Sequence, residues 1–202
     1  VRVRTLRVLA SISLSGCYDL FGPTEVRVDD GELTIIAVDP DAPPLEAMQV
    51  SFWAKKGEDR SVQISYLYDD GTVGKCLRFI VPSDALLRNA NGQMIEEGDS
   101  VEITIDVIDP HLFLFQFNPR GLDFDPEHPA RVEVHYRYAS LDLDNDGIEG
   151  DPDDFAIMSR FGIWKQERNG EPWEEIASRR DETRKELYAD ITGFTRYALA
   201  AD

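Results

Sequence analysis

The feature that most constrains this chain is an alternation of apolar and polar residues with a period of two, which recurs from residue 25 onward. Successive side chains of a β-strand point to opposite faces, so this alternation is typical of strands with one buried face. The clearest runs are residues 62–68, 77–81, 101–107 and 132–138. They predict many short strands, each buried on one side.

Short segments rich in glycine, proline, aspartate and asparagine separate these runs, among them DDGE, DPDAPP, KKGEDR, DDGTVG, EEGDS, NPRG and ERNGEP. Glycine accepts positive φ, proline fixes φ, and the Asp and Asn side chains bond to nearby backbone, so all four favour tight turns. Strands joined by tight turns pair antiparallel. We therefore predict an all-β fold, an antiparallel β-sandwich of roughly ten strands with at most one or two short helices.

Three segments need separate treatment. In VPSDALLRNANG (81–92), a Ser-Asp pair precedes an apolar run and Asn-Gly follows it, which predicts a helical turn. In DDFAIMSRFG (153–162), the apolar spacing fits both a helix and a strand, and the choice stays open. In HLFLFQFNP (111–119), apolar residues occupy both odd and even positions, so both faces of a strand would be apolar. This indicates either a central strand covered on both faces or a contact patch.

The first 17 residues have the layout of an export signal. Three arginines and no acidic residue precede an uncharged run at residues 8–14, and small residues follow. Leu14-Ser15-Gly16-Cys17 resembles the bacterial lipobox, in which the signal is cut before a cysteine that becomes diacylated. The alternative is an ordinary edge strand built on the early valines.

The lipobox resemblance implies an organisation for the whole chain. Residues 1–17 would be a lipoprotein signal peptide, 18–24 a short tether, and 25–202 a β-sandwich domain. The lipid on Cys17 would anchor the protein to a membrane of the bacterial cell envelope, at the periplasmic face or the cell surface. Because the only other cysteine is Cys76, no internal disulfide is available, and we expect Cys76 to be a small core residue.

The strongly negative net charge limits which classes of partner the protein can bind. The formal net charge is −18, which repels phosphate backbones and makes nucleic acid an unsuitable partner, whereas cations are favoured. No G-x-S-x-G nucleophile motif is present, and the three histidines lack the usual metal-ligand spacing. His135 would lie on the strand face opposite to Val134 and Tyr136, and it is therefore predicted to be on the surface.

Four segments resemble the ZU-type sandwich domain of tight-junction scaffold, netrin-receptor and ankyrin proteins, and more closely the version carried by bacterial lipoproteins. They are LRFIVPSDAL, NPRGLDFDPEHPARVEVHY, GIWKQERNGEPWEEIAS and ADITGFTRYALA, within residues 60–202. Some ZU-type domains cleave themselves at a His-Phe-Ser motif. Here Gly193-Phe194-Thr195 has glycine in place of the base, so we expect an intact chain with Phe194 in the core.

We therefore predict a non-catalytic binding or structural module whose partner is an envelope protein or a polysaccharide. The alternative is an enzyme acting on carbohydrate or peptidoglycan, which would need paired carboxylates in an open groove. Trp53, Trp164 and Trp173 could form its sugar platform, although aromatic residues in strands more often belong to the core.

The stretch LDLDNDGIEGDPDDF (141–155) predicts a calcium site. Asp142, Asp144 and Asp146 stand at the first, third and fifth places of D-x-D-x-D-G, and Asp153 stands at the twelfth. The stretch resembles the single-copy dockerin-type calcium loop, but its twelfth residue is Asp instead of Glu and its hydrophobic residue comes one place early. The alternative is a solvated acidic hairpin.

Overall fold

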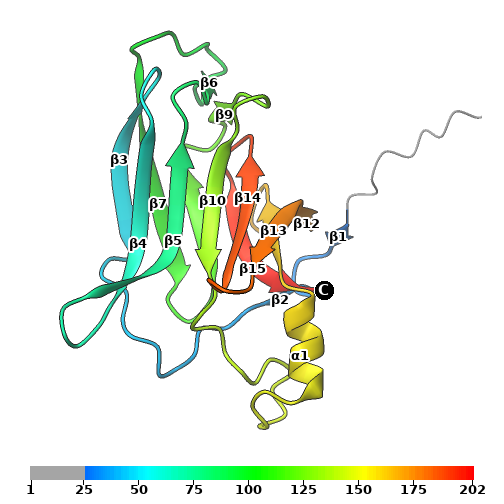
Figure 1. Ribbon diagram of the computed structural model, residues 1–202. Helices are drawn as coiled ribbons and strands as arrows, with labels where there is room; N and C mark the ends of the chain where they lie inside the picture. Colours follow the sequence, from blue (N-terminus) through cyan, green and yellow to red (C-terminus); the bar gives the residue numbers. More distant parts are fainter. Residues whose placement is uncertain (1–25) are drawn as a thin grey trace, which may run out of the picture.

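A computed structural model describes residues 26–202 of the 202-residue chain. The predicted signal peptide, tether and lipidation site at Cys17 lie outside the described residues. Within residues 26–202 there are fifteen strands and one helix, and every strand pair is antiparallel. The predicted all-β antiparallel sandwich is therefore confirmed (Figure 1).

The larger sheet has eight strands. Its order is β1 (Arg27–Val28), β12 (Trp173–Ile176), β11 (Gly162–Gln166), β15 (Arg196–Ala201), β8 (Leu114–Asn118), β7 (Ser100–Asp109) and β3 (Gln49–Lys55), with β2 (Thr34–Ile35) also paired to β15. The chain enters at β1 and ends in β15, so segments from both ends of the described chain lie in one sheet.

The smaller main sheet has five strands. Its order is β13 (Ser178–Asp181), β14 (Glu186–Ile191), β10 (Ala130–His135), β5 (Val73–Val81) and β4 (Arg60–Leu67). A third sheet pairs β6 (Leu86–Arg88) with β9 (Asp123–Phe124). The short turn between β3 and β4 connects the two main sheets at one edge of the sandwich.

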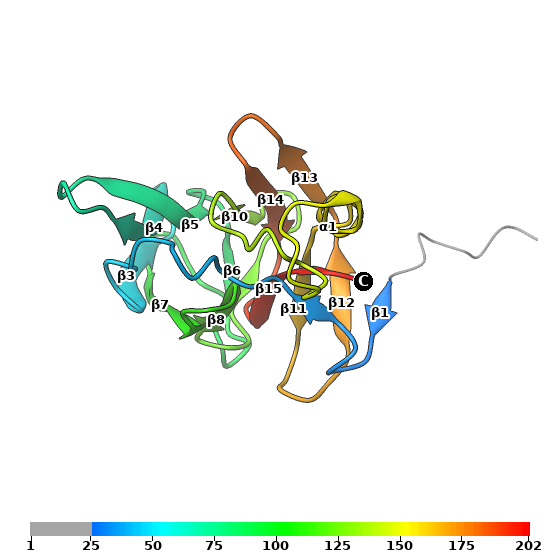
Figure 2. The same ribbon diagram turned by 90° about the horizontal axis from the view of Figure 1, so that it is seen from below.

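The main core lies between the two large sheets, which face one another in Figure 2. Alternate residues of each strand supply it, as the period of two requires. Phe79 on β5 is fully buried and its ring packs on the ring of Phe117 from β8, with centroids 5.3 Å apart. The two sheets are thus joined by edge-to-face aromatic contacts as well as by aliphatic side chains.

Both faces of the sheet are covered where the chain enters strand β8, so apolar side chains point to both sides there. Phe113, Phe115 and Phe117 belong to the main core. Leu114 points the other way into a second cluster with Trp164, Trp173 and Leu33. Of the two interpretations of residues 111–119, a central strand covered on both sides is confirmed, since β8 lies between β15 and β7.

Three details differ from the sequence expectations or settle them. The helical turn predicted in residues 81–92 is wrong, because a turn at Ser83-Asp84 leads into strand β6, whose buried Leu86 pairs with Phe124. Residues 153–162 divide between the helix α1 (Pro152–Ser159) and the start of β11. The chain also forms more strands than roughly ten, several of them only two residues long.

Cys76 is buried and unpaired on β5, as predicted for a core residue. Burial raises the pKa of its thiol to about 11, so the thiol is protonated and unreactive near neutral pH. Between Val26 and Asp202, no helix has both the length and the apolar character needed to cross a bilayer.

Candidate metal centre

The acidic loop connects β10 to α1 and lies beside α1 at the lower end of the molecule in Figure 1. Asp151 is the N-cap of α1, and its side chain accepts hydrogen bonds from the backbone of Asp153 and Asp154. Pro152 follows at the first helical turn, where a missing N–H does no damage. The loop therefore ends at a capped helix N-terminus, and this cap holds the C-terminal side of the loop in place.

The structure brings together three of the four predicted calcium ligands. Asp142, Asp144 and Asp146 each offer a carboxylate oxygen, and these atoms all lie within 4.8 Å of one another. Asp142 Oδ1 is buried without a hydrogen-bond partner. An unpaired buried carboxylate oxygen is unfavourable unless a cation or a donor satisfies it.

The other carboxylate oxygens of this group fold the loop. Asp142 Oδ2 accepts from the Gly147 N–H at 3.1 Å, and Asp144 Oδ1 accepts from the Asp146 N–H at 3.1 Å. Gly147 has a φ of 86°, the left-handed region that glycine adopts without strain. A glycine at the sixth place therefore lets the chain turn sharply between the third ligand and the rest of the loop.

The fourth predicted ligand, Asp153, is not part of this group. Its side chain is exposed in the first turn of α1, whereas its neighbour Asp154 is fully buried. Asp154 Oδ1 accepts from the Leu143 N–H at 2.6 Å, and its Oδ2 accepts from the Asp151 N–H at 3.1 Å. Asp154 therefore ties the loop backbone to the first turn of α1. It is part of a capping box that the sequence interpretation did not identify.

Two carboxyl groups of the loop have shifted pKa values. Burial acts to raise the pKa of Asp154, but the backbone N–H groups of Leu143, Asp151 and Asp144 outweigh it and lower that pKa below its usual range. The Asp146 N–H acts to lower the pKa of Asp144, yet burial and the neighbouring carboxylates raise it overall. Negative charge is thus crowded at Asp144, where a bound cation would relieve the repulsion.

The tryptophans do not form a shared platform. Trp164 and Trp173 are buried in the second cluster, and Trp173 Nε1 donates to Asp30 Oδ1 at 3.1 Å. Trp53 is 60% exposed on the edge strand β3, in the other half of the same sheet. The suggestion that the three rings lie together is wrong, and the preference for the core is confirmed for two of them.

The segment Gly193-Phe194-Thr195 is structural in its contacts. Phe194 is buried and packs on the rings of Phe117 and Phe124. The Thr195 hydroxyl is buried and donates to the Gln166 carbonyl. The expectation that Phe194 belongs to the core is confirmed, although Phe194 lies just before β15; Tyr197 and Leu199 on β15 belong to the same core.

The prediction that His135 lies on the surface is wrong. His135 does point away from the main core, opposite to Val134, but it is only 7% exposed. Its neighbours include Glu186, brought in by pairing of β10 with β14. The sequence showed that residues 133 and 135 share one strand face, but no local pattern indicated that Glu186, 51 residues after His135, would lie beside them.

Comparison with protein-family models, with curated protein sequences and with solved structures finds no match to this chain. The resemblances to ZU-type domains, to the lipobox and to dockerin-type loops therefore remain interpretations of the sequence.

Proposed function

We propose that this protein is a non-catalytic, calcium-binding β-sandwich module of the bacterial cell envelope, anchored by a lipid on Cys17. The observation that carries the calcium assignment is the convergence of Asp142, Asp144 and Asp146 around an unpaired, buried oxygen of Asp142. Hard oxygen ligands from alternate residues of a tight loop suit Ca²⁺.

The role we propose for the ion is structural. It would neutralise the crowded carboxylates and hold the loop between β10 and α1, presenting this end of the sandwich to an envelope protein or polysaccharide. The Thr195 hydroxyl is buried and donates to a backbone carbonyl, which argues against self-cleavage as the activity.

The test is the melting temperature of the purified chain in calcium, in magnesium and in chelator. Sites of this kind in extracellular modules bind with a Kd of about 0.1–1 mM. Ten millimolar calcium would then stabilise the fold by up to about 2.7 kcal/mol. For a domain of this size, that corresponds to a rise of about 5–10 °C.

Matched variants locate the effect. Asp144→Ala should abolish the difference between calcium and chelator, because it removes one of the three grouped carboxylates. Asp153→Ala should retain the difference, because Asp153 lies outside the group. Magnesium should raise the melting temperature less than calcium does. Identical melting curves in calcium and chelator would leave the stretch as a solvated acidic loop.

A further inference from the structure

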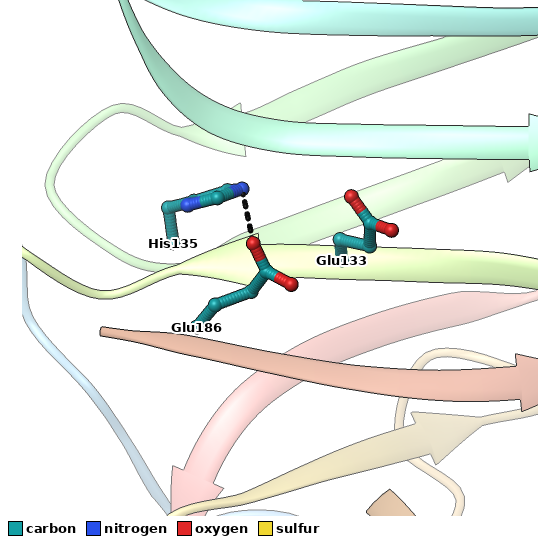
Figure 3. A group of neighbouring side chains, drawn as sticks. All are labelled: Glu133, His135 and Glu186. Carbon is teal, nitrogen blue, oxygen red and sulfur yellow. Dashed lines mark ion pairs between the residues drawn. The ribbon is translucent and has the colours of Figure 1, made fainter. Parts of the chain in front are cut away.

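A second group of metal-ligating side chains lies on the outer face of the five-stranded sheet, away from the acidic loop. Glu133 and His135 are on β10 and Glu186 is on β14, and one ligand atom from each lies within 4.8 Å of the others. Figure 3 shows the His135 ring and the Glu186 carboxylate turned toward one another, with Glu133 beside them.

Pairing of the strands creates this group. His135 and Glu186 are directly opposite in the β10–β14 register, and Glu133 stands two residues before His135 on the same face. Val132 and Val134 point to the opposite face, into the main core. The ligands therefore sit on a rigid scaffold of two paired strands, which holds a metal geometry better than a loop does.

The strongest sign of an incomplete site is the imidazole of His135. Its side chain is 9% exposed, and Nε2 lies 3.0 Å from Glu186 Oε2, yet the two atoms are not aligned for a hydrogen bond and Nε2 has no hydrogen-bond partner. Glu186 is also buried, at 5% exposure. A buried nitrogen and a buried carboxylate that point at the same place are satisfied together by a cation.

We infer that Glu133, His135 and Glu186 bind a divalent first-row transition metal ion, with Zn²⁺ as the best-fitting candidate. Imidazole nitrogen distinguishes such ions from Ca²⁺ and Mg²⁺, which prefer oxygen ligands alone. Three protein ligands leave a fourth tetrahedral position for water.

The separations fit this ion after a small adjustment. Zn–N and Zn–O bonds of about 2.0–2.1 Å place tetrahedral ligand atoms roughly 3.3 Å apart. The His135–Glu186 pair is already at 3.0 Å, and rotation of the long Glu133 side chain can close the remaining distance. Glu133 Oε2 lies 3.6 Å from Arg78 Nη1, and this contact leaves Oε1 for the metal.

The protonation state also suits a metal ligand. Burial, together with the nearby charges of Lys75 and Arg184, lowers the pKa of His135 to about 4 against the opposing effect of Glu133. The ring is therefore neutral near pH 7, the form in which imidazole binds metals. The nearby cations oppose metal binding, but the two carboxylates of the site and the net charge of −18 attract it.

The fourth position has access to solvent. Glu133 and Glu186 line a surface depression of about 440 Å³ together with Arg131, Arg180 and Tyr188. His135 lines a second depression of about 250 Å³ on its other side. Water can therefore reach the ion from this face.

The experiment is competition for Zn²⁺ between the full-length chain and a chromophoric chelator. Every form carries Cys17→Ser to remove the thiol of that residue as a zinc ligand, and millimolar calcium is present to occupy the acidic loop. We expect one zinc ion per chain with a micromolar or lower Kd. His135→Gln, Glu186→Gln and Glu133→Gln should each weaken binding at least tenfold, as loss of a ligand requires.

The matched control is His128→Ala, which removes an exposed histidine outside the group and should leave zinc binding unchanged. Circular dichroism confirms that each variant folds, and three independent substitutions keep the test decisive if one does not. Absence of saturable zinc binding, or binding that survives both His135→Gln and Glu186→Gln, overturns the inference. Its failure leaves the calcium proposal untouched, because the two groups share no residue.

Discussion

Truncation of Phe79 to alanine tests how the two sheets are held together. Phe79 is fully buried in the middle of β5. Its ring packs against Phe117 at 5.3 Å, Phe194 at 5.5 Å, Phe124 at 6.1 Å and Phe52 at 6.3 Å between centroids. Phe52 and Phe117 lie in the opposite, eight-stranded sheet, Phe124 lies in the two-stranded β6–β9 sheet, and Phe194 lies in a loop. One side chain therefore connects several parts of the core.

The expected loss follows from the burial and the ring contacts. Removing a buried phenylalanine ring costs about 3–5 kcal/mol in lost transfer energy and residual cavity. Each well-placed aromatic pair adds about 0.5–1.5 kcal/mol beyond its buried area. We therefore place Phe79→Ala at the upper end, about 4–5 kcal/mol, against a total stability on the order of 5–15 kcal/mol. Phe79→Leu keeps most of the volume and should cost about 1.5 kcal/mol.

The assay is equilibrium unfolding in urea, followed by circular dichroism and tryptophan fluorescence with chelator present, so that metal binding does not contribute. The midpoint should fall while the slope stays the same. Trp53→Ala is the control, since Trp53 is 60% exposed and its loss should change stability by no more than about 0.5 kcal/mol. A loss below about 2 kcal/mol for Phe79→Ala would refute the reasoning.

Three further predictions concern the lipid anchor at Cys17, the buried carboxylate of Asp154, and the Gly193-Phe194-Thr195 segment. The chain expressed with its leader in bacteria should partition into detergent with an acyl mass increment, and Cys17→Ser should not; wild-type protein found wholly in the aqueous phase contradicts lipidation. Asp154→Asn should lower the melting temperature at pH 7, because three backbone N–H groups lose a charged acceptor. Since the folded-state pKa of Asp154 lies below its ordinary value of 3.8, that stabilisation is present above about pH 4 and is lost as pH falls through the folded pKa, so the two melting curves should converge at low pH. Mass spectrometry of purified protein should find the chain whole, and a fragment ending at Phe194 would show that Thr195 acts as a nucleophile.

The strand pattern was readable from the sequence because it depends on neighbouring residues alone. Alternation at residues 132–138 separates Val132 and Val134, which enter the core, from Glu133 and His135, which do not. Apolar residues at both odd and even positions of 111–119 likewise indicated either a central strand covered on both faces or a contact patch, and the structure shows the first. The D-x-D-x-D-G spacing placed Asp142, Asp144 and Asp146 around one point, since a tight loop brings alternate side chains together.

Contacts between distant segments decided the rest. Residues 81–92 favour a helical turn locally, but Leu86 finds a partner strand at Phe124 and the pairing prevails over the local preference. Asp154, not Asp153, closes the acidic loop because only the helix start determines which of two adjacent carboxylates turns inward. His135 is buried beside Glu186 because β10 pairs with β14, and a strand register that joins residues 51 positions apart is set by packing of the whole sandwich.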